Sequence, residues 1–66
     1  MKLRLLGVES GKNGCPALYA TDRGTFVVQG KLVTDEGAIA SLVDVREDEF
    51  YVEIPRDLLR FAKENE

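Results

Sequence analysis

The sequence of 66 residues contains no histidine and only one cysteine, Cys15. A single cysteine excludes a disulfide within the chain, and the missing histidine removes the commonest general base of enzyme active sites. Structural zinc is held by several cysteine and histidine ligands, so we expect neither a metal nor a cofactor. Without a histidine partner or a second cysteine, Cys15 is interpreted as a small buried hydrophobic residue. A thiol enzyme that uses Cys15 is our third and last hypothesis.

Long hydrophobic runs are missing as well. The apolar start of the chain is interrupted by Arg4 and ends at Glu9, which is too short for the core of a signal peptide. No stretch approaches the roughly 20 apolar residues that cross a membrane. We therefore expect a cytoplasmic protein with a reduced thiol.

A chain of this length predicts a single domain, residues 1–66, with a small core. Domains of this size bury only about 60% of the surface that their unfolded chains expose. Small scaffolds commonly compensate with disulfides, a metal or a partner. Hydrophobic residues make up 44% of the sequence, which is enough for a folded core. With disulfides and metals set aside, the composition favours tight packing or self-association.

The net charge of −3 is distributed unevenly along the chain. Residues 1–33 contain five basic and two acidic residues, whereas residues 34–66 contain four basic and ten acidic ones. Such an asymmetry can mark a surface for a partner or for nucleic acid. An acidic protein is repelled by phosphate at long range, so a solvated surface is the preferred interpretation.

Alternating apolar residues predict three strands in the first half of the chain. The first two strands are expected at residues 2–8 and 16–21, and the third at residues 25–33. The turn sequence TDRG at 21–24 connects the last two of these strands as a hairpin. Gly24 is expected to adopt the left-handed conformation that such hairpin loops need.

Gly30 lies inside the third predicted strand and allows two readings. A bulge there would reverse the faces of the following residues, whereas an unbulged strand keeps Leu32 in line with Phe26. We prefer the unbulged strand. Gly30 then leaves a gap on the core face, which we expect Phe50 or Phe61 to fill, with a ligand or partner chain as the alternative.

The second half of the chain predicts two helices separated by a strand. Thr34 is expected to cap a short helix, and a strand is expected at residues 49–54. Pro55 suits the first position of a terminal helix, because its backbone is already fixed in a helical φ. The order β-β-β-α-β-α predicts an α+β fold, a small and mainly antiparallel four-stranded sheet covered by the C-terminal helix.

The predicted sheet has two apolar faces of unequal size. Val27, Val33 and Tyr51 lie on the face away from the terminal helix and are the candidate partner interface. The predicted core contains Leu3, Leu5, Phe26, Val28, Leu32, Ile39, Leu42, Val52, Ile54, Leu58 and Phe61.

Basic residues on the N-terminal strands support an alternative function. Arg4, Arg23 and Lys31 are the candidate contacts of a small nucleic-acid-binding β-ribbon protein. The patch is sparse, and only Tyr19 and Tyr51 offer an aromatic platform for bases. We therefore rank nucleic acid behind protein as the expected partner.

Three segments follow the layout of a known group of proteins: NGCPALY at 13–19, TFVVQGK at 25–31 and FYVEIPRDLLRFA at 50–62. The sequence resembles small uncharacterised actinobacterial proteins that are encoded beside helix-turn-helix regulators. The resemblance implies a protein partner of a transcriptional regulator rather than a catalyst. Together with the second apolar face, it leads us to expect a non-enzymatic protein-interaction module that self-associates as a homodimer.

Overall fold

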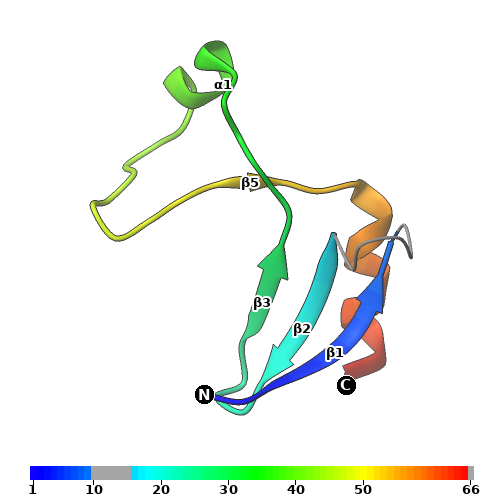
Figure 1. The fold of residues 1–66 in the computed structure, drawn as a ribbon. Helices are drawn as coiled ribbons and strands as arrows, with labels where there is room; N and C mark the ends of the chain where they lie inside the picture. The colour runs from blue at the N-terminus through cyan, green and yellow to red at the C-terminus, as the bar shows by residue number, and fades with distance from the viewer. Residues whose placement is uncertain (10–15, 66) are drawn as a thin grey trace.

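Three antiparallel strands form the main sheet of the protein. The computed structural model describes residues 1–9 and 16–65, and the predicted interpretation of Cys15 lies outside these residues. The strands β1 (Leu3–Val8), β2 (Ala17–Thr21) and β3 (Phe26–Gln29) lie side by side in the order β1-β2-β3 (Figure 1). The first two strands and the start of the third agree with the sequence prediction to within one residue.

The second half of the chain forms a smaller sheet and two helices. Strands β4 (Lys31–Leu32) and β5 (Val52–Glu53) pair antiparallel as a separate two-stranded sheet. Residues 33–51, which connect them and which we call the arm, contain the short helix α1 (Glu36–Ala40). The chain ends in η1 (Arg56–Asn65), a 3₁₀ helix that follows Pro55.

The α+β class and the antiparallel strands are confirmed, but the prediction of one four-stranded sheet is wrong. The third predicted strand stops at Gln29 and resumes at Lys31 in the second sheet. Gly30 marks this change of sheet: a side chain there would lie 2.8 Å from Ile54 Cγ2 and 2.9 Å from the carbonyl oxygen of Glu53. The group beside Gly30 is therefore the chain leaving β5, and neither Phe50 nor Phe61 fills that space.

The turn between β2 and β3 is the predicted hairpin. Gly24 has a φ of 77°, which is the left-handed conformation expected for this position. The hydroxyl of Thr21 accepts hydrogen bonds from the backbone N–H groups of Arg23 and Thr25, at 3.1 and 3.2 Å. A threonine at the start of the turn thus holds the loop in shape and fixes the register of the two strands.

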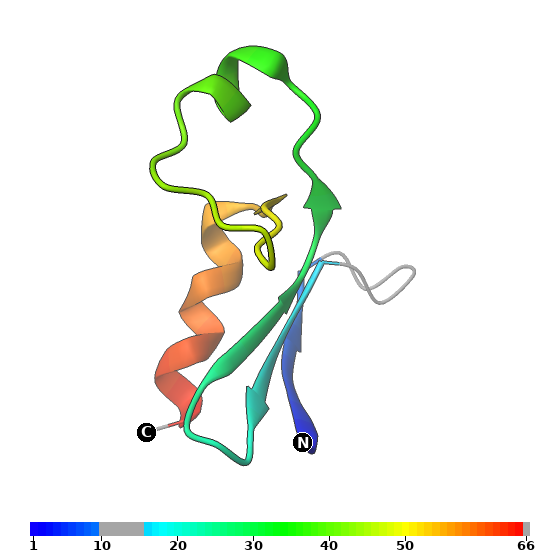
Figure 2. The ribbon, with the colours of Figure 1, turned by 90° about the vertical axis from the view of Figure 1, so that its left-hand side faces the viewer.

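The core lies between the three-stranded sheet and η1. Helix η1 contacts β1 and β2 and runs beside one face of the sheet (Figure 2). Leu18 of β2 and Leu58 of η1 are the largest fully buried side chains, with exposed fractions of 1% and 0%. A 3₁₀ helix places residues i and i+3 in one row, so Phe61 follows Leu58 toward the sheet. Leu59 lies outside that row and is exposed.

The contact between η1 and β1 depends on a glycine. A side chain at Gly7 would collide with the ring of Phe61, so the ring rests directly on the backbone of β1. Arg60 strengthens the same contact, since its Nη1 lies 2.8 Å from Glu9 Oε1 and its guanidinium lies 4.2 Å from the centroid of the Phe61 ring. The ion pair is partly exposed and contributes at most about 1 kcal/mol.

Much of the predicted core is exposed. Leu58 is confirmed as a core residue, and Val28, Ile39, Val52, Ile54 and Phe61 are half-buried. The prediction is wrong for Leu3, Leu5, Phe26, Leu32, Leu42 and, as a gap-filling residue, Phe50, all of which are exposed. The buried residues that it missed are Ala17, Leu18 and Ala20 of the central strand. A central strand is covered by neighbours on both edges, and short side chains there are buried whatever their own hydrophobicity.

Helix α1 begins one residue later than predicted. Asp35, and not Thr34, caps the helix, because its carboxylate Oδ2 accepts a hydrogen bond of 2.8 Å from the N–H of Ala38. The helix ends at Ala40 and contains no buried residue. The capping chemistry expected of this segment is therefore present, but the helix packs against no core.

The arm extends away from the three-stranded sheet (Figure 1). The radius of gyration is 13.1 Å, whereas a compact domain of this length has a value of about 11 Å. None of residues 33–51, all of which the structure describes, is buried. No helix in the described part of the chain is long and apolar enough to cross a membrane.

Candidate functional site

A groove lined by apolar and acidic residues lies between the edge of the main sheet and the arm. Its wall on the sheet side is Phe26 and Val27 of β3, and the opposite wall comes from arm residues between 42 and 51. The groove has a volume of about 880 Å³, within the range of pockets that hold ligands or side chains of a partner. The complete lining, which defines the groove, is Phe26, Val27, Leu42, Val43, Val45, Asp48, Glu49, Phe50 and Tyr51.

The arm side of the groove presents its apolar side chains to solvent. Phe50 is 86% exposed and Val43 is 82% exposed, and neither makes part of the core. An exposed aromatic side chain beside an open groove is a feature of surfaces that bind other proteins. The groove is consequently the strongest candidate site among the described residues.

Acidic residues form the rim of this wall. Asp48 and Glu49 line the groove, and Asp44 and Glu47 lie in the same segment of the arm. The carboxylate of Glu49 accepts a hydrogen bond of 3.0 Å from the N–H of Arg46, which closes a turn before Phe50. Asp44 has a φ of 56°, a conformation in which aspartate is tolerated better than most residues. The turn at residues 46–49 directly precedes Phe50 in the chain.

The open face of the three-stranded sheet continues from the groove. Leu5, Tyr19 and Val27 lie opposite one another on β1, β2 and β3 and therefore share a face. Gly7 and its partner Leu18 belong to the other face, the one that η1 contacts. On the open face Tyr19 donates a hydrogen bond of 2.8 Å to Gln29, and Leu5 is 53% exposed. Val27 joins this face to the groove.

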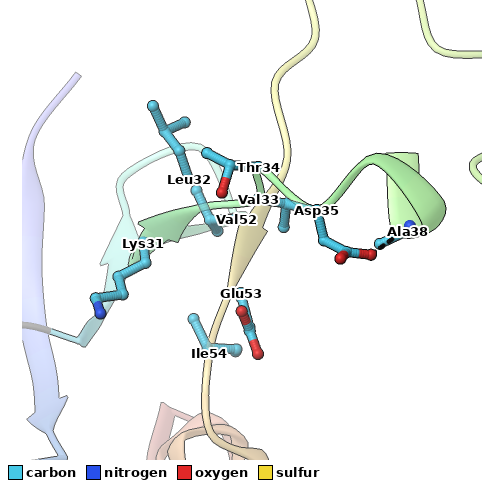
Figure 3. A pocket seen from close by; sticks show the side chains of 9 residues that line it. All are labelled: Lys31, Leu32, Val33, Thr34, Asp35, Ala38, Val52, Glu53 and Ile54. Atoms are coloured by element: carbon cyan, nitrogen blue, oxygen red, sulfur yellow. Dashed lines mark hydrogen bonds between the residues drawn. The ribbon is translucent and has the colours of Figure 1, made fainter. Parts of the chain in front are cut away.

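A second pocket lies around the two-stranded sheet (Figure 3). It has a volume of about 790 Å³ and is lined by residues 31–35, 38 and 52–54. Lys31 and Leu32 extend to different sides of β4, and the carboxylate of Asp35 turns toward Ala38, whose N–H it caps. Since Asp35 is engaged in the helix cap, this pocket offers a ligand little beyond Lys31 and Glu53, which lie opposite each other in the ladder.

The predicted interface residues lie close together, though not on one flat face. Val27 and Tyr51 line the groove, and Val33 lines the second pocket. The N–H of Val33 donates a hydrogen bond of 3.2 Å to the carbonyl of Tyr51, which joins the two sites. All three side chains are half-buried. The three predicted residues thus lie in or next to the groove, but the prediction did not include the most exposed residues there, Phe50 and Val43.

The basic residues of the alternative hypothesis are divided between two ends of the sheet. Arg4 pairs with Ala20, which pairs with Phe26 next to the turn that contains Arg23. Lys31 lies beyond Gln29, at the opposite end of β3, and belongs to the second sheet. Arg4 and Arg23 therefore share one end of the sheet, and Lys31 lies at the other.

Sequence reasoning missed Phe50, Val43 and Val45 as surface residues. Phe50 was expected to face the same way as Val52 and Ile54 in the last predicted strand and to be one of two candidates for the gap at Gly30, yet that strand covers only Val52 and Glu53. The signal that identifies it is local: Phe50 directly follows Glu47, Asp48 and Glu49, and three consecutive acids rarely enter a core.

Comparisons with known proteins give no counterpart. No family model, curated protein or solved structure matches the chain. Among the residues that the structure describes, no group of three or more potential ligands could hold a metal ion. The predicted thiol site cannot be placed, because Cys15 lies outside the described residues.

Proposed function

We propose that this chain is a non-enzymatic protein-interaction module that self-associates and serves as the partner of a transcriptional regulator. The observation that carries the proposal is the groove with Phe50 and Val43 exposed at its wall. Large apolar side chains that gather around a groove mark a surface for another protein. The regulator as partner follows from the sequence resemblance, and a cytoplasmic location agrees with the lone cysteine and with such a partner.

The position of the groove supports docking of a protein in preference to a small molecule. The groove is open to solvent between β3 and the arm, and Val27 belongs both to its lining and to the open sheet face. A site for a small ligand usually encloses most of the ligand's surface. With η1 on one face of the three-stranded sheet, the opposite face and the groove form one surface for a partner.

Tyr51 is the residue that best tests this function. It lines the groove, and its carbonyl holds the arm to Val33 through the backbone, which a change of side chain leaves intact. Tyr51→Glu introduces a charge into the apolar surface, and Tyr51→Phe keeps the ring as the matched control. We expect Tyr51→Glu to weaken association about tenfold or more, as for an aromatic residue at an interface centre.

The measurement is light scattering after size-exclusion chromatography, on the chain alone and after co-expression with a helix-turn-helix regulator identified from the neighbouring genes. The expected result is self-association of the wild type, a complex with the regulator, and loss of both in Tyr51→Glu but not in Tyr51→Phe. A wild-type chain that is monomeric and forms no complex with the regulator would falsify the proposed function.

A further inference from the structure

We propose that a second copy of this chain closes the groove, with Phe50 of each copy inserted into the groove of the other. This inference rests on the proposed function and names the occupant of its surface. The two copies would be related by a two-fold axis, so that the same patch is used on both. The arm of one copy would then lie on the sheet side of its partner's groove.

The exposed area of the chain agrees with a missing partner of this size. The accessible surface is 5553 Å², whereas a compact monomer of 7.3 kDa exposes about 4,200 Å². The excess is about 1,400 Å² per chain, or about 2,800 Å² for two chains, which lies within the range that obligate homodimers bury. A specific interface of standard size buries about 800 Å² on each partner, so the excess is larger than such an interface needs.

A projecting aromatic side chain lies beside the groove. Phe50 is the most exposed large hydrophobic residue of the described chain, at 86%, and its own groove offers Phe26 and Val27 as an apolar wall. An interface with two-fold symmetry requires a surface that fits itself, and a projecting aromatic ring next to an apolar groove meets that requirement. The ring of each copy would pack on the β3 wall of the other.

Charge decides how the two copies are oriented. The arm contains six acidic residues and one basic residue, whereas the described residues up to Leu32 contain four basic and two acidic ones. Two arms placed against each other would repel, and an arm placed against the partner's sheet is attracted. Asp48 lies on the rim of the groove and Arg23 lies in the turn that precedes Phe26, so this orientation sets opposite charges on the two sides of the contact.

Two pairs of variants test the interface. Phe50→Asp puts a charge at the centre of the contact, and Leu59→Asp makes the same change at an exposed apolar residue of η1. Arg23→Glu changes the charge beside the groove, and Arg56→Glu makes that change on η1. In sedimentation velocity we expect Phe50→Asp to weaken the dimer by about thirtyfold or more. Arg23→Glu should weaken it less, and only at low salt.

If Phe50→Asp fails to fold, a cross-linking experiment tests whether Phe50 of one copy lies next to Phe26 of the other. In a Cys15→Ser background, a tagged chain with Phe26→Cys is mixed with an untagged chain that carries Phe50→Cys. The expected product under mild oxidation is a disulfide-linked dimer of one tagged and one untagged chain. The matched mixture of Phe26→Cys with Leu59→Cys should give no such product.

The outcomes separate this inference from the proposed function. A wild-type dimer that persists in Phe50→Asp and gives no mixed cross-link overturns the interface and leaves self-association intact. A monomeric wild type that still binds the regulator overturns the second copy as occupant and assigns the groove to the regulator. Loss of the dimer in Phe50→Asp together with the mixed cross-link establishes the inference.

Discussion

Two regions of the molecule can be compared: the three-stranded sheet together with η1, and the arm. They differ far more in how many residues are buried than in their hydrophobic content. Nine of the 19 arm residues are hydrophobic, a share close to the 44% of the whole chain. The buried hydrophobic residues of the described chain, Ala17, Leu18, Ala20 and Leu58, nevertheless all belong to β2 and η1. The difference shows that apolar content sets how much surface can be buried, whereas the position of a segment between other segments decides whether it is buried.

The largest effect is expected from removing the central contact of the buried region. Leu58→Ala should lower the free energy of unfolding by about 2–5 kcal/mol, because it leaves a cavity between η1 and β2. The matched control is Leu59→Ala, because the side chain of Leu59 is 56% exposed. This change should lower the free energy of unfolding by well under half as much. Urea denaturation measures both. Equal losses for the two variants would mean that η1 does not pack as the structure has it.

A smaller effect is expected where the ring of Phe61 rests on β1. Gly7→Ala adds a methyl group that collides with this ring, and overpacking of this kind costs about 1–3 kcal/mol. The control is Gly37→Ala in α1, where the nearest atom to the added carbon is Asp35 Oδ2 at 3.4 Å. That change should be neutral or slightly stabilising, since alanine favours helix.

A double-mutant cycle sharpens this second prediction. The cost of Gly7→Ala should fall strongly in a Phe61→Ala background, because the side chain that it strikes is then absent. Thermal or urea denaturation of the wild type, the two single variants and the double variant gives the coupling free energy between positions 7 and 61. A cost that is the same in both backgrounds would indicate that Gly7 is needed for its backbone conformation and not for the ring.

The smallest effect is expected in the arm. Asp35→Ala removes the cap of α1 and should destabilise this helix by about 1 kcal/mol, whereas Asp35→Asn keeps a side-chain acceptor and should change little. Because α1 buries no residue, the loss should remain local. Hydrogen exchange should become faster at the amides of α1 and stay unchanged in β2. Faster exchange in both segments would contradict the separation of the two regions.

Local features of the fold were predicted well from the sequence. The hairpin of β2 and β3, the left-handed Gly24 and the start of the terminal helix after Pro55 all depend on residues that lie a few positions apart. The cap of α1 was assigned to the neighbouring Thr34, which is an error of one residue within the right chemistry. Turn and cap signals are short-range, and for this reason a sequence pattern can carry them.

Long-range features were predicted poorly. Alternation alone continued the third strand through Gly30 and placed Leu32 in the core, although Leu32 is 66% exposed. The close approach of Glu53 and Ile54 to Gly30 depends on residues more than 20 positions away, and no local pattern reports it. For the same reason Phe50 was expected as a candidate to fill the gap at Gly30, whereas it is exposed beside the groove.

The sequence by itself determined the α+β class, the hairpin, the helix cap to within one residue and the division of charge between the two halves of the chain. Tertiary structure alone decided that the strands form two sheets, that alanines of the central strand are buried, and that Phe50 stands beside an open groove. The physical reason is that turns and caps are satisfied by neighbouring backbone groups. Burial instead depends on which distant segments meet, and for the arm the proposed second copy supplies the missing segment.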